Sequence, residues 1–281
     1  MDIKTILKEN NFEFKHKFGQ NFITDTNLLK AIVGDSDIQS DDCVLEIGAG
    51  AGTLTKEICQ KTQAKVISVE IDKKLKPILE QNLSSFKNLE IIFDDILKIS
   101  PQKLKEAFSN KLFKVVANLP YYISTPIIFY LLENGFNIKS ITVMLQLEVA
   151  KRLTAQVGTK DYGALTILLQ FLGEVFLTRK VPRTLFVPQP NVDSAIVRID
   201  LKEKDFGVSF EEFAPFIKAC FAMRRKTLEN NIISAFPVSR EEFKTACLNQ
   251  NINTNTRAEN LNIFEFVSLF KELFKNNTKK E

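Results

Sequence analysis

The chain has 281 residues, enough for one large domain or two unequal ones, and its 44% of hydrophobic residues can fill a sizeable core. Its formal net charge of +4 permits a polyanionic partner without requiring one. The four cysteines form no C-x-x-C pair and the only histidine is His16, a composition that nearly excludes zinc sites, disulfide frameworks and Ser-His-Asp catalysis.

The chain also lacks the signals that direct proteins to membranes or to secretion. No apolar run is as long as a membrane span, and the opening residues MDIKTILKEN have no secretory apolar core. We therefore expect a cytoplasmic protein with reduced core cysteines, no metal ion and no membrane contact, and we expect a monomer. His16, between two lysines, is expected to contact phosphate or solvent and not to catalyse.

From residue 26 the chain alternates between helical and strand patterns. Residues 26–34 carry apolar side chains at helical spacing, and polar-faced helical stretches follow at 54–61 and 75–83. Short apolar runs between them predict strands that are buried on both faces, at 43–47, 65–71, 89–93, 114–119 and 140–146. Strands that alternate with helices predict an α/β fold with a doubly wound, mostly parallel, Rossmann-like sheet.

The pattern changes after Gly163. Residues 163–172 are compatible with a helix, and 174–181 and 194–201 predict two late strands joined by the loop PRTLFVPQPNVD. From about residue 205 the apolar residues keep helical spacing to the end of the chain. We therefore predict a large α/β domain over residues 1–203 and a small helical C-terminal domain over 204–281.

The first predicted strand runs into a glycine turn, Glu46-Ile47-Gly48-Ala49-Gly50-Ala51-Gly52. Glycines at this spacing permit a sharp turn and the close approach of a ligand to the start of the next helix, although many proteins join a strand to a helix in this way. Glu70 ends the second strand, where a carboxylate can accept both hydroxyls of a ribose, or simply face solvent. Asp95 ends the third strand and is favoured over Asp94 to accept the amino group of an adenine ring. These residues predict a nucleoside site without separating a dehydrogenase from a methyltransferase.

The fourth strand ends in Asn118-Leu119-Pro120-Tyr121-Tyr122, which suits methyl transfer to an exocyclic amine. The N6 nitrogen of adenine is a poor nucleophile because its lone pair is delocalised into the ring. The Asn118 amide oxygen and the Leu119 carbonyl are candidates to accept its two hydrogens and to orient the lone pair. Tyr121 offers a ring to stack on an extruded base.

These motifs resemble those of the ribosomal-RNA adenine N6,N6-dimethyltransferases. The resemblance is carried in family order by six blocks: FGQNF (18–22), Glu46–Gly52, NLPYYIST (118–125), Gln146 with Glu148, FVPQPNVDS (186–194) and RRKTL (224–228). It implies a methyltransferase sheet with a small helical C-terminal domain.

The resemblance also assigns roles to individual residues. Cofactor contacts to S-adenosyl-L-methionine are implied for Asn21, Ile23, Gly48, Glu70, Asp95 and Asn118. Tyr121 would stack on one face of the target base and Phe186 would cover the other, although Phe186 in a proline-rich loop fits a hydrophobic plug equally well. Tyr122 departs from the family, which often has Asn or His there.

The implied substrate is a pair of adjacent adenines in a hairpin loop near the 3′ end of small-subunit (16S) rRNA, dimethylated during ribosome assembly. The cluster Arg224, Arg225 and Lys226 suits RNA phosphates or a solvated helix face. The alternatives are a large-subunit rRNA methyltransferase that confers antibiotic resistance, a non-catalytic ribosome-assembly factor, a nicotinamide-dependent oxidoreductase and an adenine methylase acting on DNA.

Overall fold

The computed structural model describes residues 19–202 and 204–275, so His16 lies outside the described residues. The chain divides into two compact units, each continuous in space but not in sequence. The first unit contains Met1–Ala150 and Phe176–Leu201, and the second contains Lys151–Val175 and Lys202–Glu281. The second unit thus includes a segment before residue 203 that we had placed in the α/β domain.

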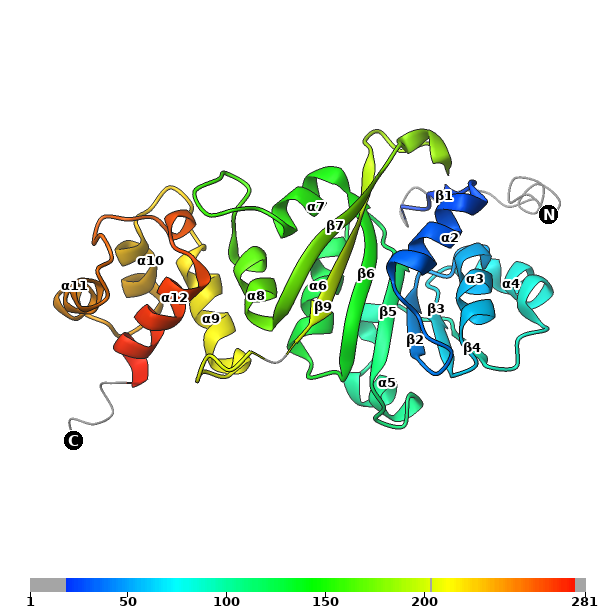
Figure 1. Cartoon of the computed structure of the whole chain (residues 1–281), viewed down its shortest axis with the longest axis horizontal. Coiled ribbons are helices and arrows are strands. Elements are labelled where there is room, and N and C mark those ends of the chain that lie inside the picture. The colour runs from blue at the N-terminus through cyan, green and yellow to red at the C-terminus, as the bar shows by residue number, and fades with distance from the viewer. Residues whose placement is uncertain (1–18, 203, 276–281) are drawn as a thin grey trace. The chain divides into compact units, whose positions relative to one another are not determined.

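A seven-stranded sheet forms the centre of the α/β fold, in the order β4-β3-β2-β5-β6-β9-β7 (Figure 1). The pairs β2–β3, β3–β4, β2–β5 and β5–β6 are parallel, and β9 pairs with β6 in the antiparallel sense. The doubly wound, mostly parallel fold is therefore confirmed. The strands are β2 (Cys43–Ile47), β3 (Val66–Val69), β4 (Leu89–Ile92), β5 (Phe113–Asn118), β6 (Ile138–Gln146), β7 (Gly173–Val181) and β9 (Ser194–Leu201).

The central strands β2, β3 and β5 are buried because helices join and cover them, whereas the edge strand β4 has no fully buried residue. All five residues of β2 are buried, as expected for a strand enclosed on both faces. The connecting helices are α2 (Thr26–Asp35), α3 (Thr53–Lys61), α4 (Lys76–Leu83), α5 (Pro101–Ala107), α6 (Ser124–Glu133) and α7 (Leu147–Leu153). Helix α2 begins after Asp25, whose side chain accepts a hydrogen bond from the Leu28 amide at 2.7 Å.

The strand order reverses between β3 and β5, on either side of β2. In sheets of this kind the crevice at such a reversal, outside the carboxyl ends of the strands, is where ligands bind. The glycine turn, Glu70, the Asp94–Asp95 pair and Asn118 all follow these strand ends. The fold therefore brings the predicted site residues to one edge of the sheet.

A second, two-stranded sheet lies beside this edge. Strand β1 (Phe22–Ile23) pairs antiparallel with β8 (Phe186–Val187), so that Phe22 faces Val187 and Ile23 faces Phe186. The backbone amide and the hydroxyl of Thr24 both donate to the Leu185 carbonyl, at 2.9 and 3.0 Å. This pairing, which we had not expected, holds the segment before α2 against the loop that precedes β9.

The second unit is helical, with α8 (Ala164–Leu172), α9 (Phe210–Cys220), α10 (Leu228–Ala235), α11 (Arg240–Asn249) and α12 (Ile263–Phe270). Capping boxes begin α9, α11 and α12, at Ser209, Ser239 and Asn262. Helix α8 belongs to this unit because Phe171 stacks on Phe213 of α9 at 4.8 Å between ring centroids. No helix in the described part of the chain is long and apolar enough to cross a membrane.

Candidate active site

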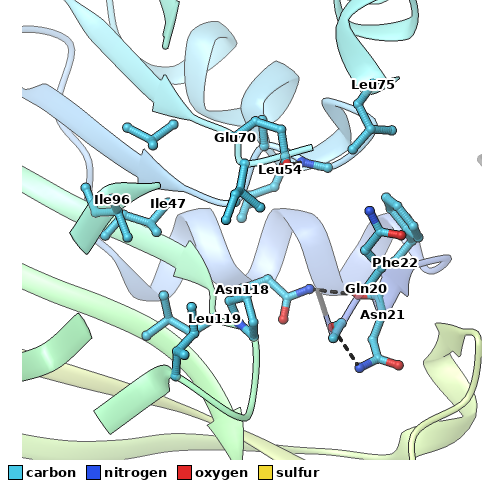
Figure 2. Close-up of a pocket in the computed structure, with 18 of the residues that line it drawn as sticks. Gln20, Asn21, Phe22, Ile47, Leu54, Glu70, Leu75, Ile96, Asn118 and Leu119 are labelled. Carbon is cyan, nitrogen blue, oxygen red and sulfur yellow. Dashed lines mark hydrogen bonds between the residues drawn. The ribbon is translucent and has the colours of Figure 1, made fainter. Parts of the chain in front are cut away.

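One pocket lies at the carboxyl edge of the sheet, with an empty volume of about 950 Å³ including its open mouth. Its lining comes from the ends of β2, β3 and β5, the turn after β4, and the segment 19–23 that precedes α2. Figure 2 shows Glu70 on one side of this pocket and Asn118 on the other. Among the predicted residues, those that line the pocket are Asn21, Ile23, Gly48, Glu70, Asp95, Asn118, Leu119 and Tyr121.

The glycine turn requires glycine for conformational and steric reasons. Gly50 has φ +57° and Gly52 has φ +83°, values that side chains of L-residues rarely adopt. A Cβ on Gly50 would lie 3.1 Å from the Phe22 ring, and one on Gly52 would lie 2.9 Å from Leu83. Residues 48–51 of the turn, and Thr53 and Leu54 at the start of α3, line the pocket.

Glu70 is held by backbone donors from two directions. Its Oε2 accepts the Gly50 N–H and its Oε1 accepts the Asp72 N–H, both at 2.8 Å. The side chain is 6% exposed, and burial raises its pKa, an effect that these backbone hydrogen bonds oppose. Because each carboxylate oxygen has a second lone pair, both remain able to accept the hydroxyls of a ribose.

The Asp94–Asp95 pair follows β4. Asp95 is partly buried and its Oδ1 accepts the Leu97 N–H at 3.1 Å, whereas Asp94 is exposed and accepts the Asp95 N–H at 2.8 Å. Both residues line the pocket, beside the buried side chain of Ile96. The greater burial of Asp95 is consistent with our preference for it, and its contact with an adenine ring stays a prediction.

The amide group of Asn118 is oriented by a backbone carbonyl. Its Nδ2 donates to the carbonyl oxygen of Asn21 at 2.9 Å, and the Asn21 side chain donates to the Gly19 carbonyl at 3.2 Å. Figure 2 shows the nitrogen of Asn118 turned toward Asn21 and the oxygen turned away from it. Since the nitrogen is already engaged, the oxygen is the atom of this amide that can accept a hydrogen bond from a ligand.

The sequence model of the ribosomal RNA adenine dimethylase family matches residues 11–275. The chain belongs to this family. Two curated relatives named ribosomal RNA small subunit methyltransferase A, from Geobacillus sp. (strain WCH70) and Alkaliphilus metalliredigens (strain QYMF), are 42% and 41% identical to it. These matches cover 95% and 96% of this chain and 94% and 95% of the relatives.

Solved structures of related proteins agree with this membership. A dimethyladenosine transferase from Plasmodium falciparum is 28% identical, with a TM-score of 0.72 over 92% of this chain and 98% of its own. The 23S rRNA methyltransferase ErmE is also 28% identical, with a TM-score of 0.67 over 90% of this chain and 99% of its own. The family resemblance inferred from the sequence is therefore confirmed.

One residue that the family resemblance assigned to the target base lies elsewhere. Phe186 is 2% exposed and packs in a core cluster with Ile23, Val181 and Ile196, and it is not among the residues that line the pocket. Its pairing with Ile23 in the β1–β8 sheet explains this burial. Phe186 is thus buried, as a hydrophobic plug would be, and it supports the pocket lining through Ile23, while its contact with the target base stays a prediction.

The two tyrosines after Pro120 differ in environment. Tyr121 is partly buried, its hydroxyl lies 2.6 Å from the Ser194 hydroxyl, and burial raises its pKa. Tyr122 is 55% exposed, and a Cβ on Gly19 would lie 3.2 Å from its ring. Tyr122, where the family often has Asn or His, thus lies at the pocket beside Gly19.

Arg224, Arg225 and Lys226 are exposed residues of the helical unit. The Arg224 guanidinium donates to the Lys160 carbonyl within the same unit. The three residues lie in the turn between α9 and α10. They are therefore not on a solvated helix face, which was one of the two interpretations of the sequence. Their contact with RNA stays a prediction.

Sequence reasoning missed two polar residues around the pocket. Gln20 donates to the Asp72 carboxylate at 3.0 Å and thereby joins the segment before α2 to the turn after β3. Ser194 contacts Tyr121, as described above. Gln20 and Ser194 both lie in sequence blocks that carried the family resemblance. Their place in these blocks was the signal that could have marked them as residues near the site.

A buried carboxyl lies beneath the glycine turn. Glu46 is fully buried in β2, and its Oε2 accepts the Ser68 hydroxyl at 2.6 Å. Burial raises its pKa to about 7, the Ser68 hydrogen bond opposes this rise, and the charge of Glu70 adds to it. Glu46 therefore holds its proton well above the usual range of a glutamate.

Proposed function

We propose that this chain transfers methyl groups from S-adenosylmethionine to N6 of two adjacent adenines in a hairpin loop near the 3′ end of small-subunit (16S) rRNA, giving N6,N6-dimethyladenine. Membership of the ribosomal RNA adenine dimethylase family and the names of the relatives at 41–42% identity support this proposal. We further propose that the enzyme acts as a monomer on cytoplasmic precursors of the small subunit, during ribosome assembly.

The pocket residues fit S-adenosylmethionine. Glu70, fixed by the Gly50 and Asp72 amides, can accept the two ribose hydroxyls. Gly48 leaves space for a ligand, because a Cβ there would have no neighbour closer than 3.6 Å. Asp95 and Ile96 at the far end suit the amino edge and the face of an adenine ring. When bound, the cofactor supplies an electrophilic methyl group on a sulfonium.

The observation that carries the proposal is the orientation of Asn118 on the opposite side of the pocket. With Nδ2 donating to Asn21, Oδ1 can accept a hydrogen from the N6 amino group of the target adenine. The Leu119 carbonyl is proposed to accept the second hydrogen, and the two contacts together would turn the nitrogen lone pair toward the methyl carbon. Tyr121 would stack on the extruded base. After methyl transfer the nitrogen releases a proton to solvent, so no strong base is needed.

The helical unit supplies the proposed contact with the RNA backbone. Arg224, Arg225 and Lys226 are exposed and consecutive, so they present three positive charges that can neutralise RNA phosphates. The large-subunit alternative is less well supported, since identity to the 23S rRNA methyltransferase ErmE is 28% against 42% for the small-subunit relatives.

The proposal is tested by labelled-methyl transfer to undermethylated small subunits, with the products identified by nucleoside mass. Wild-type protein should yield N6,N6-dimethyladenine, and Asn118→Ala should lower the rate by roughly a hundredfold or more, the cost of losing one oriented acceptor in an active site. Cofactor affinity, measured by calorimetry, should change little. Asn137→Ala removes an exposed amide at the other end of the sheet and should retain full activity.

Two results would contradict the proposal. A wild-type protein that methylates only large-subunit RNA or DNA would redirect the substrate. Full turnover by Asn118→Ala would remove the role assigned to this amide.

A further inference from the structure

The hydroxyl of Tyr121 is fixed by a residue outside the pocket. Its oxygen lies 2.6 Å from Ser194 Oγ, across 73 residues of sequence. Tyr121 lines the pocket, whereas Ser194 does not and is fully buried. The contact therefore joins a pocket residue to the sheet behind it.

Ser194 is itself held in place by the sheet. It is the first residue of β9 and pairs with Gln146 at the end of β6. The preceding Asp193 accepts the Leu147 amide through its carbonyl at 2.9 Å and the Arg183 amide through its carboxylate at 3.0 Å. The backbone of Ser194 is thus held by the pairing with β6 and by the hydrogen bonds of Asp193. Because the Ser194 side chain is short and fully buried, its hydroxyl has little freedom to move.

The other end of Tyr121 is also constrained. Its backbone lies in the turn after β5, where the Ile123 amide donates to the Pro120 carbonyl at 3.2 Å and the Ser124 hydroxyl donates to the Tyr121 carbonyl at 3.3 Å. A tyrosine with both its backbone and its hydroxyl held cannot swing about its χ1 bond without breaking the contact with Ser194. The position of the ring and the direction of its long axis, from Cβ to the hydroxyl, are therefore determined by two separate segments, the turn after β5 and the start of β9.

We propose that Ser194 is a positioning residue for methyl transfer: its hydroxyl holds the Tyr121 ring at the place in the pocket where it can stack on the target adenine. This inference rests on the proposed function, in which Tyr121 contacts the base. A ring that swings away about χ1 would let the stacked base shift and would displace its amino nitrogen from the oxygen of Asn118, which ends β5 three residues before Tyr121. Burial raises the pKa of Tyr121, so its hydroxyl stays protonated and able to hydrogen-bond at neutral pH.

The inference is tested with two variants that each remove one partner of the same hydrogen bond, Ser194→Ala and Tyr121→Phe. Each should lower the single-turnover rate of methyl transfer by about tenfold at saturating cofactor and RNA, the effect of one neutral hydrogen bond. The double variant should be no slower than either single variant, because both act through one bond. Ser194→Thr, which keeps a hydroxyl, should restore most of the rate.

A second readout separates positioning from general stability. Cofactor affinity should stay within about twofold of wild type in all these variants, because the affected ring faces the target base. Quenching of a 2-aminopurine placed at the target adenine should weaken in Ser194→Ala, which reports poorer stacking. Ser140→Ala is the matched control, since Ser140 is a buried serine of β6 whose hydroxyl has no hydrogen-bond partner among the described residues.

The outcomes distinguish this inference from the proposed function. An active wild type with an unimpaired Ser194→Ala, or with losses that multiply in the double variant, would overturn the inference alone. A rate loss in Ser194→Ala matched by Ser140→Ala would assign it to core packing and overturn the inference as well. A wild type that transfers no methyl group would overturn the proposed function, and the inference with it.

Discussion

Replacing Glu46 with glutamine should change how the stability of the protein depends on pH. The folded protein holds the Glu46 proton up to pH about 7, whereas the unfolded chain releases it near 4.5. Between these values the unfolded chain binds fewer protons than the folded one, so the free energy of unfolding falls as pH rises. Raising the pKa from 4.5 to about 7 corresponds to a decrease of about 3 kcal/mol in the free energy of unfolding as the pH rises across this range.

Glutamine keeps an acceptor for the Ser68 hydroxyl and cannot ionise, so Glu46→Gln should lack this part of the pH dependence. Urea unfolding followed by circular dichroism, repeated from pH 4.5 to above 7, gives the free energies. The stability of Glu46→Gln relative to wild type should increase by about 3 kcal/mol as the pH rises over this range. Glu80→Gln, which changes an exposed glutamate on α4, should follow the wild-type curve in parallel. If the stability of Glu46→Gln also followed pH in parallel with wild type, the conclusion that Glu46 keeps its proton up to about pH 7 in the folded protein would be refuted.

Three further predictions concern the pocket, the glycine turn and the basic cluster. Glu70→Gln should weaken cofactor binding by at least tenfold in calorimetry, since a charged acceptor of two hydroxyls is lost, while Glu90→Gln on the exposed part of β4 should not. Gly52→Ala should destabilise the protein by roughly 1–3 kcal/mol in urea unfolding because of its positive φ and the contact with Leu83, whereas Gly34→Ala, with open space in α2, should stabilise it slightly. The double variant Arg224→Glu, Arg225→Glu should bind precursor small subunits more weakly than wild type, and its affinity should depend less steeply on salt concentration. Glutamate at Lys56 and Lys61 on α3 makes the same change in net charge and should have a smaller effect. Equal effects of the two double variants would indicate a contribution of net charge alone.

The strands and their carboxyl ends could be predicted from the sequence because continuous apolar runs bounded by turns have few other structures available. Once the strands were placed, parallel topology alone brought Gly48, Glu70, Asp95 and Asn118 to the same edge. The role proposed for Asn118 was inferred from its position at the end of the fourth central strand in the chain and from its neighbours. These features depend on local pattern and on general rules of topology.

The remaining features depend on contacts between distant segments. Strands β1 and β8 have two residues each, too few to show any periodicity, so their pairing left no pattern in the sequence. The burial of Phe186 follows from that pairing and was therefore equally hidden. Helix α8 was expected within the α/β domain because it precedes β7, but its phenylalanine packs on α9. In each case the side chain that decides the outcome lies far away in sequence.

The β1–β8 pairing also affects when the pocket is completed during synthesis. Thr24 and Leu185 are 161 residues apart, so their two hydrogen bonds cannot form before the loop preceding β9 has emerged, whereas the Gln20–Asp72 contact of the same segment spans only 52 residues. Strands β2, β3, β4 and β5 are available to a nascent chain much earlier. A nascent chain can thus form the glycine turn and the Asn118–Asn21 contact before the β1–β8 sheet exists, and this sheet adds the last support to the pocket late in translation.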